Sequence, residues 1–185
     1  GHAIKGSFLP PTALPRRLFA GTRTTYHSPL VIGKPTRRTG IVTAVNEKLG
    51  KSGKLIFVTV NYQYLQNDKL CIEEDQNIAY REPGTQIELP EIIEFAELPG
   101  DSWQRTLIPD PVLLFRFSAL TFNGHRIHYD RPYAVEEESY PGLLVHAPLM
   151  TILLLELLRN NSQKRISTAE FKALYPVFDS MPLRL

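Results

Sequence analysis

The stretch Ala147-Pro-Leu-Met-Thr-Ile-Leu-Leu-Leu-Glu-Leu-Leu-Arg159 decides the expected fold. Its apolar side chains leave almost no polar face, so a helix over this stretch must be wrapped by protein on most sides. Pro148 falls in the first turn, where a missing N–H costs nothing, and Asn160-Asn161 marks the end of the helix. One enclosed helix beside an antiparallel sheet indicates a sheet that curls around the helix.

The sheet is predicted upstream, where β-branched and aromatic residues dominate. Turn residues at Gly50-Lys-Ser-Gly53 and Gln66-Asn-Asp68 separate three expected strands, which cover residues 39–45, 54–64 and 69–80. This pattern predicts an antiparallel meander.

A boundary is predicted near residue 100, which gives an N-terminal half, 1–100, and a C-terminal half, 101–185. The segment 82–111 carries many acidic residues and prolines with little periodicity, so we expect a linker or a surface loop there. Beyond it, we expect a short helix at 112–120 and a polar turn at 125–130. Strand material is expected at 164–173 and 175–183.

The composition excludes several classes of protein. The chain has 185 residues, of which 43% are hydrophobic and 22% charged, which is typical of a folded globular protein. A net charge of +2 is too small for a nucleic-acid-binding surface. The single cysteine, Cys71, excludes an internal disulfide and favours a reducing compartment.

We expect neither a membrane span nor a signal peptide. The longest apolar run, 143–158, is interrupted by polar residues and is shorter than the roughly 20 residues that cross a bilayer. Residues 1–7 lack a charged and then apolar pattern. A cytoplasmic location is therefore the default expectation.

Three of the five histidines, His125, His128 and His146, fall within twenty-two residues. A His-x-x-His pair can bind zinc, but no cysteine or regular carboxylate spacing completes a set of ligands, and we predict no metal. The alternative is a purely structural role, in which these polar side chains form hydrogen bonds within caps and turns of a loop.

The histidines lie in Phe117-Ser-Ala-Leu-Thr-Phe-Asn-Gly-His-Arg-Ile-His-Tyr-Asp130, which is followed by Tyr140-Pro-Gly-Leu-Leu-Val-His146. The first stretch resembles the hydratase motif of the MaoC-like, (R)-specific enoyl-CoA hydratases, which have the hotdog fold. Both stretches more closely resemble the double-hotdog subfamily that contains itaconyl-CoA and mesaconyl-C4-CoA hydratases and mitochondrial-type 3-hydroxyacyl-thioester dehydratases. The opening Gly6-Ser-Phe-Leu-Pro-Pro11 is similar to the N-terminal half of that subfamily.

The resemblance implies an α+β hotdog fold in a double-hotdog arrangement, truncated at its ends. It also implies a hydro-lyase of the enoyl-CoA hydratase type that needs no cofactor and binds an acyl-CoA substrate, with a homodimer as the expected assembly. The specific expectation is hydration of itaconyl-CoA or mesaconyl-CoA to citramalyl-CoA, as in itaconate degradation. The alternatives are a 3-hydroxyacyl-ACP or 3-hydroxyacyl-CoA dehydratase of fatty-acid synthesis, and a non-catalytic hotdog protein that binds acyl thioesters.

In the resemblance, His128 takes the place of the catalytic histidine and Asn123 that of the catalytic aspartate. An imidazole can act as base and acid near neutral pH. An amide cannot take a proton, so Asn123 is expected to hold the water or the substrate. Asn123 is alternatively a turn residue before Gly124.

The start of the predicted helix suits a developing enolate, because free N–H groups and the positive end of the helix dipole point there. The Ala147 N–H is the expected oxyanion donor. His146 and His125 are further candidates for substrate binding, and His146 alternatively only fixes the turn.

Three arginines complete the candidate site. Arg126 is a candidate partner for a carboxylate on the substrate, because a guanidinium binds carboxylates in a bidentate manner. A surface pair between Arg126 and Asp130 is an equal alternative. Arg16 and Arg17 are candidates for the phosphates of CoA, although a basic run is more often a solvated face.

Overall fold

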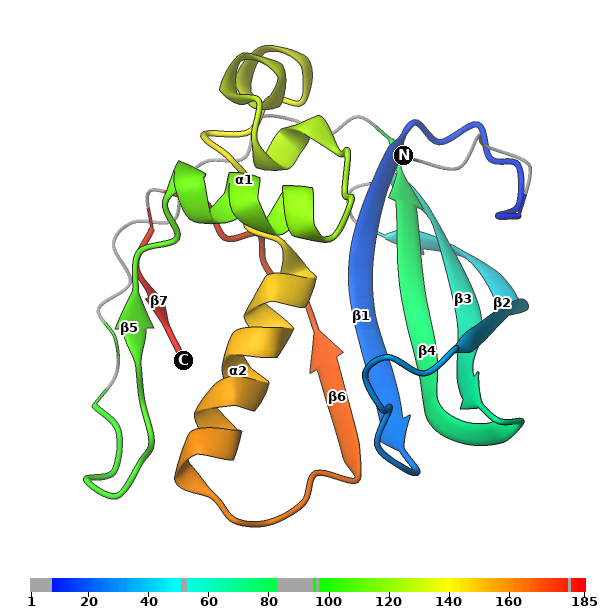
Figure 1. The fold of residues 1–185 in the computed structure, drawn as a ribbon. Coiled ribbons are helices and arrows are strands. Elements are labelled where there is room, and N and C mark those ends of the chain that lie inside the picture. Colours follow the sequence, from blue (N-terminus) through cyan, green and yellow to red (C-terminus); the bar gives the residue numbers. More distant parts are fainter. Residues whose placement is uncertain (1–7, 51–52, 83–94, 96, 180) are drawn as a thin grey trace. The chain divides into compact units, whose positions relative to one another are not determined.

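The computed structural model describes residues 8–50, 53–82, 95, 97–179 and 181–185 (Figure 1). These residues form two compact units. We call the first, built from residues 8–82 and 165–174, the sheet unit. We call the second, built from the described residues of 84–164 and 175–185, the helical unit. The division into halves 1–100 and 101–185 stays a prediction.

The sheet unit is a five-stranded antiparallel sheet in the order β2-β3-β4-β1-β6. Figure 1 shows its first four strands as long and curved. The strands are β1 (Arg16–Tyr26), β2 (Arg37–Gly50), β3 (Gly53–Gln66), β4 (Lys69–Arg81) and β6 (Thr168–Lys172).

The predicted meander is confirmed, because β2, β3 and β4 are consecutive neighbours that contain the three expected strands. The turn between β3 and β4 is tight, with Asn67 and Asp68 at φ 50° and 60°. Asparagine and aspartate tolerate this left-handed backbone, and two such residues match the twist of a hairpin. The other predicted turn, 50–53, lies partly outside the described residues.

Alternation along the strands gives the sheet one apolar and one polar face. Val58 and Val60 are fully buried and form a core cluster with Leu14, Ile78 and Tyr80. The intervening residues of β3 form hydrogen bonds across to β4, from Thr59 Oγ1 to Asn77 and from Asn61 Nδ2 to Asp75. The period of two thus places the apolar side chains on one side and a hydrogen-bonded ladder on the other.

The first strand, β1, was not predicted from the sequence. It pairs with β4 on one side and with β6 on the other, and its register shifts between Phe19 and Gly21. A side chain at Gly21 would collide with the carbonyl oxygen of Phe171 in β6. Glycine is therefore required where the two backbones approach each other.

The helical unit contains α1 (Pro111–Leu120), α2 (Ala147–Asn161), two short helical turns, η1 (Arg126–His128) and η2 (Tyr133–Glu137), and the strand pair β5 (Thr106–Leu107) and β7 (Leu183–Arg184). Both predicted helices are confirmed. The predicted linker, 82–111, lies partly outside the described residues, and its described part contains β5. The strand material predicted at 175–183 contributes a single bridge between Leu144 and Phe178, together with the first residue of β7. None of the described helices combines the length and apolarity needed to cross a bilayer.

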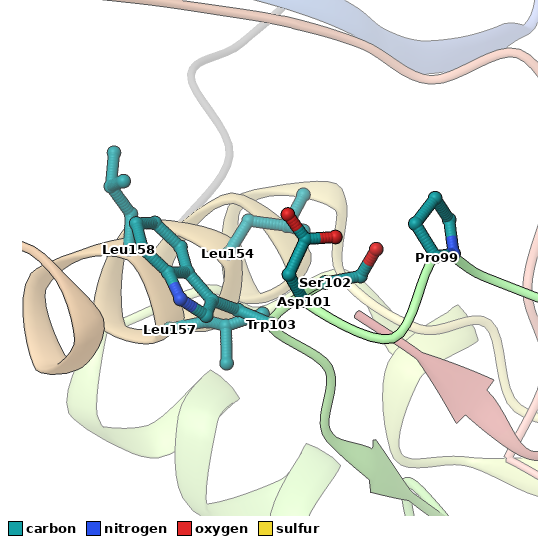
Figure 2. A pocket seen from close by; sticks show the side chains of 7 residues that line it. All are labelled: Pro99, Asp101, Ser102, Trp103, Leu154, Leu157 and Leu158. Carbon is teal, nitrogen blue, oxygen red and sulfur yellow. The ribbon is translucent and has the colours of Figure 1, made fainter.

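The sequence predicted that α2 is wrapped on most sides, but the described residues of the helical unit do not wrap it in this way. Only Leu149 and Met150 of the helix are buried, and Ile152, near its middle, is 52% exposed. The helix belongs to the helical unit, whose described strands form a single two-stranded pair, too small to enclose it. One flank borders an open groove of about 500 Å³, where Trp103 lies beside the leucines of α2 (Figure 2). The groove is lined by Pro99, Asp101, Ser102, Trp103, Leu154, Leu157 and Leu158.

Replacing Gly21 with alanine tests the close approach of β1 and β6. We expect Gly21→Ala to lower the free energy of unfolding by about 1–3 kcal/mol, because the added methyl group meets a backbone oxygen that cannot swing away. Urea denaturation measures the change. Gly100→Ala is the control, since a methyl group there meets no atom within 4 Å. Equal stability of the two variants would contradict the prediction.

Candidate active site

Helix α1 begins with a strong local signal. Asp110 is the N-cap, and its side chain accepts a hydrogen bond from the N–H of Leu113 at 2.7 Å. Pro111 occupies the first turn, where its missing N–H costs nothing. The helix then places two inward-facing residues one turn apart, Leu114 and Ser118, which are both buried.

A tight turn after α1 directs the chain toward the histidines. Phe122 has the left-handed backbone, at φ 52°, and the N–H of Asn123 donates to the carbonyl of Ser118. Asn123 Oδ1 then accepts a hydrogen bond from the N–H of His125 at 3.1 Å. In this structure the Asn123 amide therefore helps to shape the loop, and the left-handed residue is its neighbour.

His128 is buried, with 7% of its surface exposed, at the end of the 3₁₀ turn η1. Its Nδ1 lies 2.7 Å from the carbonyl oxygen of Leu144. A carbonyl can only accept, so Nδ1 carries the hydrogen and, in the neutral ring, Nε2 carries the lone pair. This tautomer makes Nε2 the atom of His128 that can take a proton.

The Leu144 carbonyl is itself fixed by the fold. The N–H of Leu144 donates to the carbonyl of Ile127 at 3.0 Å, so Leu144 is bonded to two successive residues of η1. Leu144 also forms the bridge with Phe178, and the N–H of Val145 donates to the carbonyl of Val177. The segment before α2 is thus bonded to η1 on one side and to the C-terminal segment on the other.

His146 is the residue that caps α2, and only 1% of its surface is exposed. Its ring stacks on that of His128, with centroids 3.7 Å apart and planes 18° apart. Its Nε2 lies 2.8 Å from the hydroxyl of Ser118. Among the described residues, its Nδ1 has no hydrogen-bond partner. Burial, together with the charges that His128 and His125 carry when protonated, lowers the pKa of His146 to about 3.

Two further rings complete an aromatic cluster around this pair. His125 meets the ring of His128 edge-on, with centroids 5.6 Å apart. Phe117 of α1 meets the ring of His146 edge-on at 4.8 Å. The three histidines that the sequence singled out therefore lie together, and His128 is the ring between the other two.

Arg126 pairs with Asp130. Its Nε and a terminal nitrogen lie 2.8 and 2.7 Å from Asp130 Oδ2, and its guanidinium covers the ring of Tyr133. The hydrogen bond from Arg126 is the main cause that lowers the pKa of Asp130. Because 55% of the Arg126 side chain is exposed, a competing carboxylate can reach the guanidinium from solvent.

A buried carboxylate, Asp179, joins the segments that carry the histidines. Its Oδ2 pairs with Arg131, and its Oδ1 accepts a hydrogen bond from the N–H of Leu143 at 3.1 Å. A methyl group at Gly142 would lie only 2.7 Å from that Oδ1. A glycine is therefore needed for the chain to pass this close to the carboxylate.

The candidate oxyanion donor lies at the start of α2. Ala147 is the first residue of the helix, so its N–H belongs to the first turn, which has no acceptor within the helix. Pro148 follows in the first turn and offers no N–H. Arg16 and Arg17 lie at the start of β1, in the sheet unit. Among the described residues, no three or more His, Cys, Asp or Glu side chains are placed to hold a metal ion.

The sequence profile of the Htd2 family, hydroxyacyl-thioester dehydratase type 2, matches residues 1–179. The chain belongs to this family. It is 53% identical, over all 185 residues, to mesaconyl-C(4)-CoA hydratase of Chloroflexus aurantiacus, and it spans 66% of that protein's length. It is 37% identical over 125 residues, 66% of the chain, to the mitochondrial hydroxyacyl-thioester dehydratase type 2 of Schizosaccharomyces pombe, and these residues cover 41% of that protein.

Solved structures show the same fold. HtdX of Mycobacterium tuberculosis matches 96% of this Htd2-family chain with a TM-score of 0.65 at 14% identity, over 65% of its own length. A MaoC-like dehydratase from Phytophthora capsici matches 98% of the chain with a TM-score of 0.66 at 15% identity, over 66% of its length. The predicted resemblance and the α+β hotdog class are thereby confirmed.

Several residues of the Htd2-family site were not predicted from the sequence. Ser118 lies in the last turn of a mostly apolar helix, where nothing in the pattern marks it as the partner of His146. Asp179 stands far from the motif in sequence. The Leu144 carbonyl is a main-chain group and has no sequence signal, although Leu144 belongs to the stretch that carries the resemblance.

Removing the carboxylate of Asp179 should destabilise the segments that it joins, at Arg131 and Leu143. We expect Asp179→Ala to lower the free energy of unfolding by about 1–3 kcal/mol, because the buried N–H of Leu143 loses its acceptor and the half-exposed Arg131 loses its partner. Urea denaturation measures the loss. Glu156→Ala, which removes the partner of Arg105 from an exposed pair on α2, is the matched control and should change stability by less than about 1 kcal/mol. Similar losses in the two variants would contradict this account.

The lowered pKa of His146 makes stability depend on pH. Between the ordinary histidine pKa of 6.5 and about 3, the unfolded chain binds a proton at His146 that the folded chain does not. Above pH 6.5, His146 therefore does not lower the free energy of unfolding. As the pH falls from 6.5 toward 3, this residue lowers the free energy of unfolding by at most ~1.4 kcal/mol per pH unit. His146→Phe should remove this part of the slope. Urea denaturation of both proteins at several pH values measures the difference, and parallel curves would count against it.

Proposed function

We propose that this chain carries the catalytic centre of an acyl-CoA hydratase, and that the thioester it hydrates is mesaconyl-CoA. The observation that carries the proposal is the fixed tautomer of His128, whose Nδ1–H is held by the Leu144 carbonyl so that Nε2 is the basic atom. Full-length identity of 53% to a mesaconyl-C(4)-CoA hydratase supports the choice of substrate. The chain spans 65% of the length of the solved HtdX. The proposal therefore includes a double-hotdog arrangement only for the whole protein.

The reaction adds water across the double bond next to the thioester. His128 Nε2 takes a proton from water, and the water oxygen bonds to the β-carbon while the π electrons move toward the thioester oxygen. The Ala147 N–H stabilises this enolate oxygen, with help from the positive end of the α2 dipole. The imidazolium of His128 then returns a proton to the α-carbon, which leaves the ring neutral again and gives citramalyl-CoA.

The remaining candidates have supporting roles in this proposal. Asn123 cannot exchange protons and is assigned to holding the loop and the attacking water. Arg126 is assigned to the free carboxylate of the acyl group, for which it would leave Asp130. His125, Arg16 and Arg17 stay predictions for substrate binding, as do the homodimer and a cytoplasmic location.

A second substrate class is a 3-hydroxyacyl thioester with an uncharged chain. The 37% identity to a mitochondrial hydroxyacyl-thioester dehydratase supports it. The two classes differ in the free carboxylate of the acyl group, so Arg126 separates them.

Substitution of His128 tests the catalytic assignment. We expect His128→Ala in the full chain to lower kcat for mesaconyl-CoA hydration by roughly 10²–10⁴-fold, the usual contribution of a general acid–base residue. Loss of the enoyl-thioester absorbance measures the rate. His27→Ala, a change at an exposed histidine of the sheet unit, is the matched control and should retain the parent rate. Unchanged turnover in His128→Ala would remove the enzyme assignment from this site and favour a binding protein.

Arg126→Gln tests the substrate class within the same assay. We expect a rise in KM for mesaconyl-CoA and little change for crotonyl-CoA, because only the first carries a free carboxylate on its acyl group. A parent enzyme that strongly prefers crotonyl-CoA would favour the dehydratase alternative.

A further inference from the structure

His146 is the group in the site whose role the proposed reaction leaves open. Its ring is almost completely buried, one edge is bonded to Ser118, and one face covers His128. These contacts connect three separate segments: α1 through Ser118, η1 through His128, and the start of α2 through the His146 backbone. The ring is therefore placed to act on His128 rather than on a molecule that arrives from solvent.

The hydrogen bond to Leu144 does not fix the His128 ring by itself. A single bond at Nδ1 holds one atom of the imidazole, and the ring can still tilt about the axis through that bond. A second flat ring stacked 3.7 Å away opposes the tilt on one side. The edge of His125 limits the ring plane from another direction.

We propose that His146, held by Ser118, is a positioning residue that keeps the plane of the His128 ring and the direction of its Nε2 lone pair fixed during proton transfer. This inference rests on the proposed function, because it assumes that His128 moves the proton. Ser118 acts one step further away, since it fixes the rotation of the His146 ring through the 2.8 Å contact with Nε2.

The electrostatics of the cluster agree with this role. Two imidazolium rings stacked face to face would repel each other, so a supporting ring must stay uncharged when His128 takes up a proton. The titratable groups that act on His146 are His128 and His125, and the α1 residues bonded or packed against its ring, Ser118 and Phe117, carry no charge. The depressed pKa of His146 keeps it neutral throughout the neutral pH range.

Three variants in the full chain separate positioning from substrate contact. His146→Phe retains a flat ring that can stack, whereas His146→Ala removes the ring and Ser118→Ala removes only its anchor. We expect His146→Ala to lower kcat by ~10²-fold with KM nearly unchanged, since a misdirected catalytic group costs about this much. His146→Phe keeps a ring that can stack but loses the bond to Ser118, so it should recover part of that loss, to about the same extent as Ser118→Ala.

The opposite pattern would overturn the proposal. If Nδ1 of His146 contacts the substrate, His146→Phe is as damaged as His146→Ala and KM rises in both. Parent-like kcat in His146→Ala would also overturn it.

Nitrogen NMR of His128 provides a readout that does not depend on turnover. In the parent, we expect narrow signals at the chemical shifts of a single neutral tautomer with the hydrogen on Nδ1. In the variants that tautomer should persist, because the Leu144 carbonyl still accepts the hydrogen, and we expect broader signals as the ring tilts about that bond, most of all in His146→Ala. If His146→Ala does not fold, Ser118→Ala carries the test, and parent-like kcat and line widths in that variant contradict the proposal.

The same experiments distinguish this inference from the proposed function. Full activity in His128→Ala would remove the hydratase assignment, while the nitrogen line widths would still report whether His146 orders the His128 ring. A large loss in His128→Ala without a loss in His146→Ala would leave the hydratase assignment standing and remove only the positioning role.

Discussion

The buried carboxylate of Asp179 is the constraint from which the geometry around His128 follows. A charge with so little exposure requires a cation and hydrogen-bond donors, and here Arg131 and the N–H of Leu143 supply them. The chain must pass so close that Gly142 has no room for a side chain. Leu144 is the next residue after this clamp, and its carbonyl accepts the hydrogen of His128. The contacts that a buried charge requires thereby fix the backbone beside His128, and this backbone sets the position and the tautomer of the candidate base.

Much of the fold could be predicted where local signals are strong. Strands β2 and β3 are rich in β-branched residues and β4 follows a turn signal, while α1 begins with an N-cap aspartate and a proline, so both kinds of element follow from the sequence. Strand β1 was missed because four of its eleven residues are threonine or glycine and three are arginine, which hides the apolar alternation. The exposure of α2 could not be predicted. Apolar residues indicate that a helix packs against other residues, but they do not show which residues of the chain those are.

In the site, too, the residues of a recognisable sequence motif could be predicted, and groups outside any motif could not. The clustering of His125, His128 and His146 in sequence led to a cluster of rings in space. Ser118 and the Leu144 carbonyl were missed, because a serine in an apolar helix and a main-chain oxygen acquire meaning only from what lies opposite them. For Arg126 the sequence left two interpretations open, a partner for a substrate carboxylate and a surface pair with Asp130. The structure shows the pair with Asp130, because residues four apart in a helical turn lie on the same face.

In the proposed reaction, Asn123 stands where the family resemblance places an acidic residue, and this is why His128 would need so many restraints. Where two groups share proton transfer, each can remain suited to one step. Here the amide of Asn123 is engaged with the N–H of His125 and cannot take a proton, so in the proposed reaction a single imidazole must both accept and return it. A ring used twice must keep the same orientation in both its neutral and charged forms. The bond to Leu144 survives both forms because Nδ1 keeps its hydrogen, and the stack on His146 survives because the partner stays neutral.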